Sequence, residues 1–140
     1  MTQGENASST QRLPAVFVVE DHDRLRKLII GFLGTLKDVI VVGDAPSAED
    51  ALEHAEFASA DIILTDLNMP GITGIELAQK IKKIWAEKQV ILLTAHDDSF
   101  YADKAFEAGA SAYIVKNDPN IIGETINRVL AGEHHIISAK

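Results

Sequence analysis

Three carboxylates lie within four residues directly after an apolar run, in the segment VVEDHDR: Glu20, Asp21 and Asp23. Carboxylates this close repel one another and raise each other's pKa unless a cation or solvent compensates for the charge. A further acid, Asp66, follows another apolar run in the segment DIILTDLNMPG. If Glu20, Asp21 and Asp66 share one site, their oxygen atoms suit a hard cation such as Mg²⁺, with Mn²⁺ or Ca²⁺ as alternatives. Asp23 instead fits the first turn of a helix, where the helix dipole favours an acid.

A hydroxyl and an ammonium group follow two more apolar runs, Thr94 in VILLTAH and Lys116 in AYIVKND. A divalent cation, an ammonium group and a hydroxyl together can stabilise the spread charge of a phosphoryl group during transfer. One of the carboxylates would then be the nucleophile and would form an aspartyl-phosphate. The residue types therefore favour phosphoryl chemistry, provided that the fold brings them to one place.

The elements that would position these residues are five short apolar runs at 15–19, 39–43, 62–65, 90–94 and 112–115. The runs are continuous rather than alternating, which is typical of parallel strands buried on both faces. Helical spacing of apolar residues follows each run, in stripes that include Leu28, Ile84 and Leu130. The alternation predicts an α/β, doubly wound parallel sheet with right-handed crossovers. In such folds ligands bind at the carboxyl ends of the strands, where the candidate residues stand.

Composition limits the classes of function. The 140 residues suffice for one domain, and the formal net charge of -8 argues against unaided binding to nucleic acid or to anionic membranes. Cysteine is absent, which excludes thiolate metal sites and disulfides. No apolar run approaches the ~20 residues of a membrane span, so we expect a cytoplasmic protein. We expect a disordered arm over 1–13, one domain over 14–132 and a short tail over 133–140.

In their order, one motif per predicted strand, these pieces resemble the receiver domain of two-component response regulators over about residues 14–131. The matching pieces are "ED" at 20–21, Asp66 within LTDLNMPGITG, "TA" at 94–95 and Lys116. The resemblance implies a flavodoxin-like (βα)5 three-layer sandwich with a five-stranded sheet in the order 2-1-3-4-5. It also implies that Asp66 accepts a phosphoryl group from a histidine kinase or a histidine phosphotransfer protein.

The resemblance further assigns roles around that reaction. Asp21 would bind Mg²⁺ directly and Glu20 through water, while Asp66 and the backbone carbonyl of Asn68 would complete the protein ligands. The residues implied to bind the phosphoryl group or to switch with it are Thr94, Ala95, Lys116 and Tyr113. Asn68 and His96 stand, with Leu67, where the family tunes the lifetime of the phosphoryl group.

As a member of this family the chain would be a switch rather than an enzyme, catalysing its own phosphoryl transfer and slow autodephosphorylation. Phosphorylation would change the conformation around the fourth helix, the fifth strand and the fifth helix. The helix near 100–108 is poor in large apolar residues, so its rearrangement would cost little. The output would be a partner protein or a C-terminal DNA-binding domain outside the given sequence. Formation of a homodimer is a further expectation from the family.

Three other functions compete with this hypothesis. A phosphatase of the haloacid dehalogenase kind also uses an aspartyl nucleophile and Mg²⁺, but it needs a second acid two residues later, where Asn68 stands. A flavin or nucleotide carrier would need a phosphate-binding loop after the first strand, and the EDHDR segment would repel a bare phosphate. A receiver-like interaction module that is not phosphorylated is the third alternative.

Overall fold

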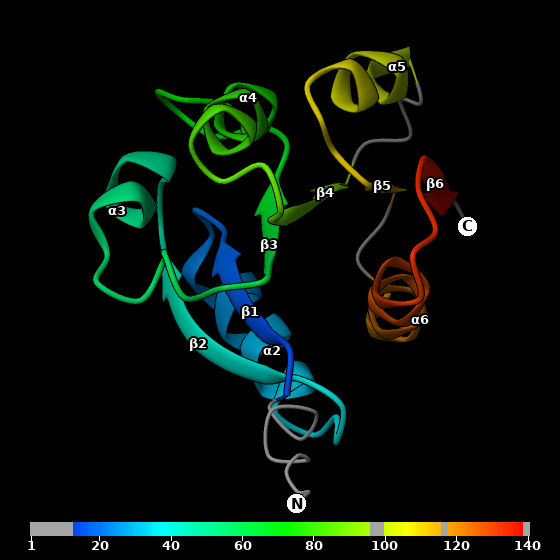
Figure 1. Cartoon of the computed structure of the whole chain (residues 1–140). Coiled ribbons are helices and arrows are strands. Elements are labelled where there is room, and N and C mark those ends of the chain that lie inside the picture. The colour runs from blue at the N-terminus through cyan, green and yellow to red at the C-terminus, as the bar shows by residue number, and fades with distance from the viewer. Residues whose placement is uncertain (1–12, 96–99, 116–117, 139–140) are drawn as a thin grey trace, which may run out of the picture.

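A computed structural model describes residues 13–95, 100–115 and 118–138. Its parallel sheet has the order β2-β1-β3-β4-β5-β6 (Figure 1). The strands are β1 (Ala15–Val19), β2 (Ile40–Ala45), β3 (Ile62–Asp66), β4 (Gln89–Thr94), β5 (Ala112–Val115) and β6 (Ile136–Ser138). The helices are α2 (Asp23–Leu33), α3 (Ala48–Glu53), α4 (Gly74–Ile84), α5 (Phe100–Glu107) and α6 (Pro119–Leu130). Of the helices within the described residues, none has the length and apolar character that crossing a membrane requires.

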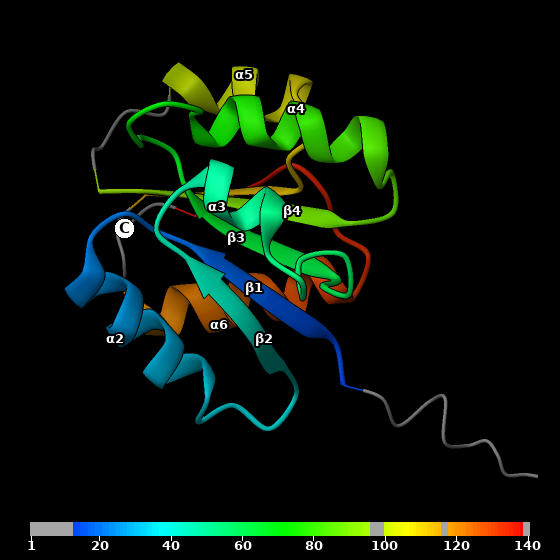
Figure 2. The ribbon, with the colours of Figure 1, turned by 90° about the vertical axis from the view of Figure 1, so that its left-hand side faces the viewer.

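Helices cover both faces of the sheet and form three layers. Figure 2 shows α3, α4 and α5 on one face and α2 and α6 on the other. Side chains of the inner strands alternate between two hydrophobic clusters, with Phe17, Ile63 and Leu92 in one and Val18 and Leu64 in the other. Burial on both faces explains why these strands read as continuous apolar runs. The predicted doubly wound architecture is confirmed.

The number of strands needs a correction. The predicted order 2-1-3-4-5 is confirmed for the first five strands, but the sheet has six strands rather than five. The sixth, β6, lies in the segment expected to be a short tail, and its Ile136 pairs in parallel with Ala112 of β5. Ile136 is buried, and the hydroxyl groups of Ser138 and Thr125 on α6 lie 3.0 Å apart. Three residues are too few to show a periodicity, and their pairing depends on the open edge that β5 offers.

Local signals fix several helix ends. Ser47 caps α3 by accepting a hydrogen bond from the backbone N–H of Asp50, as its position in the sequence predicts. Asp118 caps α6 in the same way, with Pro119 at the start of the helix. Gly109 ends the α5 region with a φ of 106°, a conformation that glycine adopts without strain.

Three residues of the predicted apolar stripes are exposed instead of buried: Leu28, Ile84 and Leu130. Helical spacing shows which residues share one face of a helix. How many of them are buried depends on how the helix packs against the sheet, which the spacing does not show. Leu28 lines a depression that also contains Glu20 and Asp66.

Candidate functional site

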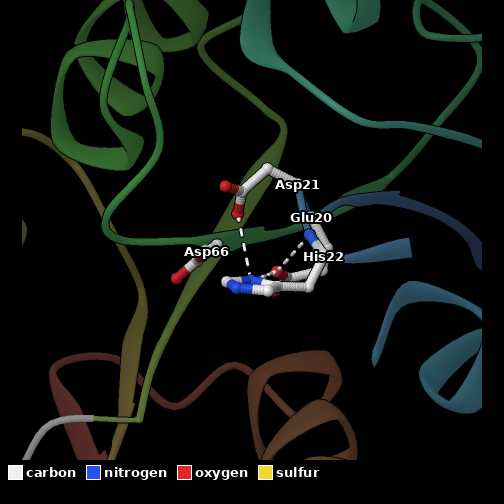
Figure 3. A group of neighbouring side chains, drawn as sticks. All are labelled: Glu20, Asp21, His22 and Asp66. Atoms are coloured by element: carbon white, nitrogen blue, oxygen red, sulfur yellow. Dashed lines mark hydrogen bonds and ion pairs between the residues drawn. The ribbon is translucent and has the colours of Figure 1, made fainter. Parts of the chain in front are cut away.

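The carboxyl ends of β1 and β3 bring the predicted acids together. Glu20 and Asp21 follow β1, and Asp66 is the last residue of β3. One ligand atom from each of these acids, and one ring nitrogen of His22, all lie within 4.8 Å of one another. Figure 3 shows these four side chains around one point at the edge of the sheet. The sequence-based prediction that β1 and β3 would place their acids side by side is confirmed in the geometry.

His22 joins the acids more closely than the sequence suggested. Its Nδ1 lies 3.2 Å from Glu20 Oε2 and 3.5 Å from Asp21 Oδ1, and its backbone N–H donates to the same Glu20 oxygen at 3.0 Å. The hydrogen bond between the His22 ring and the Glu20 carboxylate, which accepts it, raises the pKa of the imidazole, although that ring is exposed. The sequence carries no separate signal for this turn, in which the Glu20 side chain folds back onto His22.

The electrostatics of the site favour a bound cation. Burial, and next the charge of Glu20, raise the pKa of Asp66 from 3.8 to about 7. Burial also raises the pKa of Glu20, whose side chain is almost completely enclosed. The Oδ1 atom of Asp21 is buried and accepts no hydrogen bond from any residue that the structure describes. A buried carboxylate oxygen without a hydrogen bond, close to Glu20 and Asp66, fits a divalent metal as its ligand. The metal would offset the negative charge of the three acids.

The loop after β3 is held by several contacts. The backbone N–H of Asn68 donates to Asp66 Oδ1 at 3.3 Å, which turns this carboxylate towards the loop. Gly74 starts α4 so close to β3 that a Cβ atom there would overlap with the main-chain oxygen of Asp66. The backbone N–H of Ile72 donates to Glu49 Oε2 of α3 at 3.2 Å. These contacts fix where Asp66 and Asn68 stand relative to the acids after β1.

A depression of about 400 Å³ opens at this edge of the sheet. It is lined by Glu20, His22, Arg24, Leu25, Leu28, Asp66, Asn68 and Ala95. The exposed Ala95 leaves room next to Asp66, since a methyl group is small. The depression is large enough for a phosphoryl group and open enough for a donor molecule to approach.

The other predicted site residues are distributed as follows. Thr94 ends β4 and is buried, and β4 is the neighbour of β3 in the sheet. Tyr113 lies fully buried in β5, in the cluster that α4 and α5 cover. Lys116 and His96 lie outside the described residues, so their predicted roles stay predictions.

With this geometry in place, comparisons with known proteins identify the family. Residues 16–127 match the family model of the response regulator receiver domain. The response regulator UvrY of Escherichia coli (strain K12) is 35% identical over 124 residues, which are 88% of this chain and 57% of that protein. The response regulator GacA of Pseudomonas aeruginosa is 32% identical over 122 residues, or 86% of this chain and 57% of that protein. The chain thus spans little more than half the length of these curated relatives.

Solved structures agree with the sequence matches. A two-component response regulator of the LuxR family from Aurantimonas sp. SI85-9A1 superposes with a TM-score of 0.81 at 30% identity, over 92% of this chain and 90% of that one. The receiver domain of the putative response regulator NarL from Mycobacterium tuberculosis gives 0.80 at 26% identity, over 87% of this chain and 99% of that one. Because the family model covers most of the chain and the site stands at the expected strand ends, the chain belongs to the response regulator receiver domain family.

Proposed function

We propose that Asp66 is the phosphoacceptor of this receiver domain. The observation that carries the proposal is the placement of Asp66 in an open depression, beside Glu20 and Asp21, with a pKa raised to about 7. Membership in the family makes the chain a phosphoacceptor module of two-component signal transduction, a signalling switch rather than a classical enzyme. None of the reported relatives supports a phosphatase or a module that is not phosphorylated.

In the proposed reaction a carboxylate oxygen of Asp66 attacks the phosphorus atom of a phosphohistidine in the donor protein. The new P–O bond gives an acyl phosphate, while the P–N bond breaks and the leaving imidazole takes up a proton. Asp66 must be ionised to attack, and a nearby cation lowers its pKa towards that state. Bound Mg²⁺, or Mn²⁺ in its place, would neutralise charge on the transferring group. Asp21, Asp66 and the Asn68 carbonyl would hold the metal directly, and Glu20 would act through water.

After transfer, the residues on the neighbouring strands would respond to the new group. Thr94 at the end of β4 would donate a hydrogen bond to it, Lys116 would pair with its charge, and Ala95 would leave it room. Tyr113, which is buried in β5, would take the inward position of the switch as the loop after β4 moves. The helix α5 faces the sheet with the small side chains of Ala102 and Ala105, so its displacement gives up few contacts.

The same site would set how long the signal lasts. Asn68 lines the depression and is exposed, so it can meet a water molecule that attacks the acyl phosphate. His96 follows Ala95 in the sequence and would have a similar effect on slow autodephosphorylation.

The partners follow from the reaction and from the family. The donor would be a sensor histidine kinase or a histidine phosphotransfer protein in the cytoplasm. The output would be a partner protein or a C-terminal DNA-binding domain. The second choice is supported by the relatives UvrY and GacA, since the match to this chain covers only 57% of each of them. The domain itself would not bind nucleic acid or membranes because of its net charge of -8. Formation of a homodimer is a further part of this proposal.

The test is labelling by acetyl phosphate with and without Mg²⁺, followed by intact mass. We expect one phosphoryl group per chain in the wild type with Mg²⁺. We expect no labelling when EDTA is added before acetyl phosphate, and none in Asp66→Asn. The matched control Asp103→Asn changes an exposed carboxylate on α5 and should label fully. Labelling of Asp66→Asn would contradict the proposal. Release of phosphate that continues at the initial rate after the first equivalent would also contradict it, because a switch turns over only slowly from that point. Amide exchange across α5 should rise with a phosphoryl mimic, and an unchanged rate would refute the switch.

A further inference from the structure

One cationic side chain joins three elements behind the acidic site. Arg26 on α2 has a side chain that is only 13% exposed. Its Nη1 donates to the backbone carbonyl of Glu20 at 2.8 Å, and its Nε donates to Asp44 Oδ2 of β2 at 2.9 Å. Its Nη2 lies 2.8 Å from Asp23 Oδ1 in the first turn of the same helix. The guanidinium group therefore ties the end of β1 to β2 and to the start of α2.

The contact with the Glu20 carbonyl has a direct consequence for the acids. The backbone N–H of Glu20 donates directly to the Ala45 carbonyl of β2 at 3.1 Å. The backbone carbonyl of Glu20 is linked to Asp44 of β2 through Arg26. The carbonyl that Arg26 holds belongs to the peptide unit joining Glu20 to Asp21. Because a peptide unit is planar, fixing its oxygen fixes the direction in which Asp21 leaves the strand.

The charge of Arg26 is already compensated elsewhere. Arg26 forms ion pairs with both Asp23 and Asp44, so two negative carboxylates neutralise its single positive charge. Arg26 therefore does not supply the positive charge that Glu20, Asp21 and Asp66 lack, and the buried Oδ1 of Asp21 still needs a cation. What Arg26 contributes is geometry, since a planar fork of five donors can hold three acceptors in fixed directions.

We propose that Arg26 is a positioning residue for the metal site, which orients the Glu20–Asp21 peptide so that the carboxylate of Asp21 faces a divalent cation. The proposal rests on the proposed function, because it presumes that the acids bind Mg²⁺. It makes the affinity for the metal depend on a side chain that does not contact the metal. Partners of this kind affect metal affinity by about 10- to 100-fold.

The sign of the effect separates positioning from simple electrostatics. Removing a positive charge near a cation site should tighten cation binding if only the charge matters. Loss of positioning should weaken it. Arg26→Gln removes the charge. Arg26→Lys keeps the charge but replaces the planar fork by a single ammonium nitrogen, which cannot hold the three acceptors in the same fixed directions. Positioning thus predicts weaker Mg²⁺ binding by both variants, whereas electrostatics predicts tighter binding by the first and no change in the second.

The experiment measures Kd for Mg²⁺ by calorimetry, and for Mn²⁺ by electron paramagnetic resonance, with the whole chain. We expect Kd to rise about tenfold in Arg26→Lys and Arg26→Gln. The matched controls are Arg128→Lys and Arg128→Gln, since Arg128 pairs with Glu133 on the surface at 2.8 Å, and their Kd should equal that of the wild type. Unfolding of each variant in EDTA reports on stability separately, and Arg26→Lys serves as the variant that keeps the charge if Arg26→Gln does not fold.

Each outcome decides the matter. A Kd unchanged in Arg26→Lys, or lowered in Arg26→Gln, overturns the positioning role, even if either variant is less stable. Wild-type protein that binds neither metal overturns it as well, and at the same time removes the metal from the proposed function. Wild-type protein that binds Mg²⁺ but is not phosphorylated refutes the proposed function, while the comparison of the Arg26 variants still stands by itself.

Discussion

Replacing the proposed phosphoacceptor should stabilise the metal-free protein. In Asp66→Asn the carboxylate that is crowded by burial and by Glu20 becomes a neutral amide of the same shape. The pKa of Asp66 is raised in the folded chain, so the folded state binds a proton more tightly than the unfolded state does. The free energy of unfolding of the wild type therefore falls as pH rises from about 4 towards 7, and the contribution is lost above the folded pKa. In Asp66→Asn this fall in the free energy of unfolding between pH 4 and 7 should be absent.

The size of the gain follows from the shift. A rise from 3.8 to about 7 is worth about 4 kcal/mol at pH 8 if the whole shift reaches the stability. Asp66 is partly exposed, so screening by solvent and salt reduces this to about 1–2 kcal/mol. For a domain of this size such a gain raises Tm by about 3–8 °C. The gain should be small near pH 4 and should level off above pH 7.

The assay is urea unfolding in EDTA at several pH values between 4 and 8, for the wild type, Asp66→Asn and Asp38→Asn. Asp38 is exposed in the loop before β2, so its variant controls for the general effect of losing a carboxylate. An Asp66→Asn variant that is no more stable than the wild type at pH 8 would refute the reasoning. A gain equal to that of Asp38→Asn would refute it too, because it would not come from the site.

Three further predictions concern the metal, the loop after β3 and a buried lysine. At a concentration about ten times Kd, Mg²⁺ should stabilise the wild type by about 1.4 kcal/mol in urea unfolding and Asp66→Asn by much less. Gly74→Ala should lower the free energy of unfolding by about 1–3 kcal/mol and weaken Mg²⁺ binding in calorimetry, because its Cβ would push against Asp66. Lys88→Met should cost about 1–3 kcal/mol in urea unfolding, since the buried ammonium group donates to two main-chain carbonyls, while the exposed Lys83→Met should cost nothing.

The sequence predicted the positions of the acids well for a physical reason. Parallel strands with helical crossovers put every carboxyl end at one edge of the sheet, so a polar residue after each apolar run has little choice of place. Asp66 after β3 and Asp21 after β1 follow from this rule alone. The family resemblance added the roles, which composition and spacing do not contain.

What the sequence did not predict depends on contacts between distant segments. β6 forms because the edge of β5 is open and because Ile136 becomes buried there. A run of three residues is too short to predict either of these contacts. Leu28 is exposed, although its spacing matches the buried stripe. Arg26 belongs to no motif in the sequence, and its contacts form only because β2 places Asp44 beside the end of β1.

The three acids differ in how far the protein itself satisfies them. Glu20 folds back so that its Oε2 accepts hydrogen bonds from the backbone and ring of His22, and this carboxylate is therefore partly satisfied inside the protein (Figure 3). The buried Oδ1 of Asp21 receives no hydrogen bond from the described part of the chain. A cation at this edge therefore gains most from Asp21 and Asp66, and a more distant role for Glu20, through water, agrees with the hydrogen bonds that it already makes.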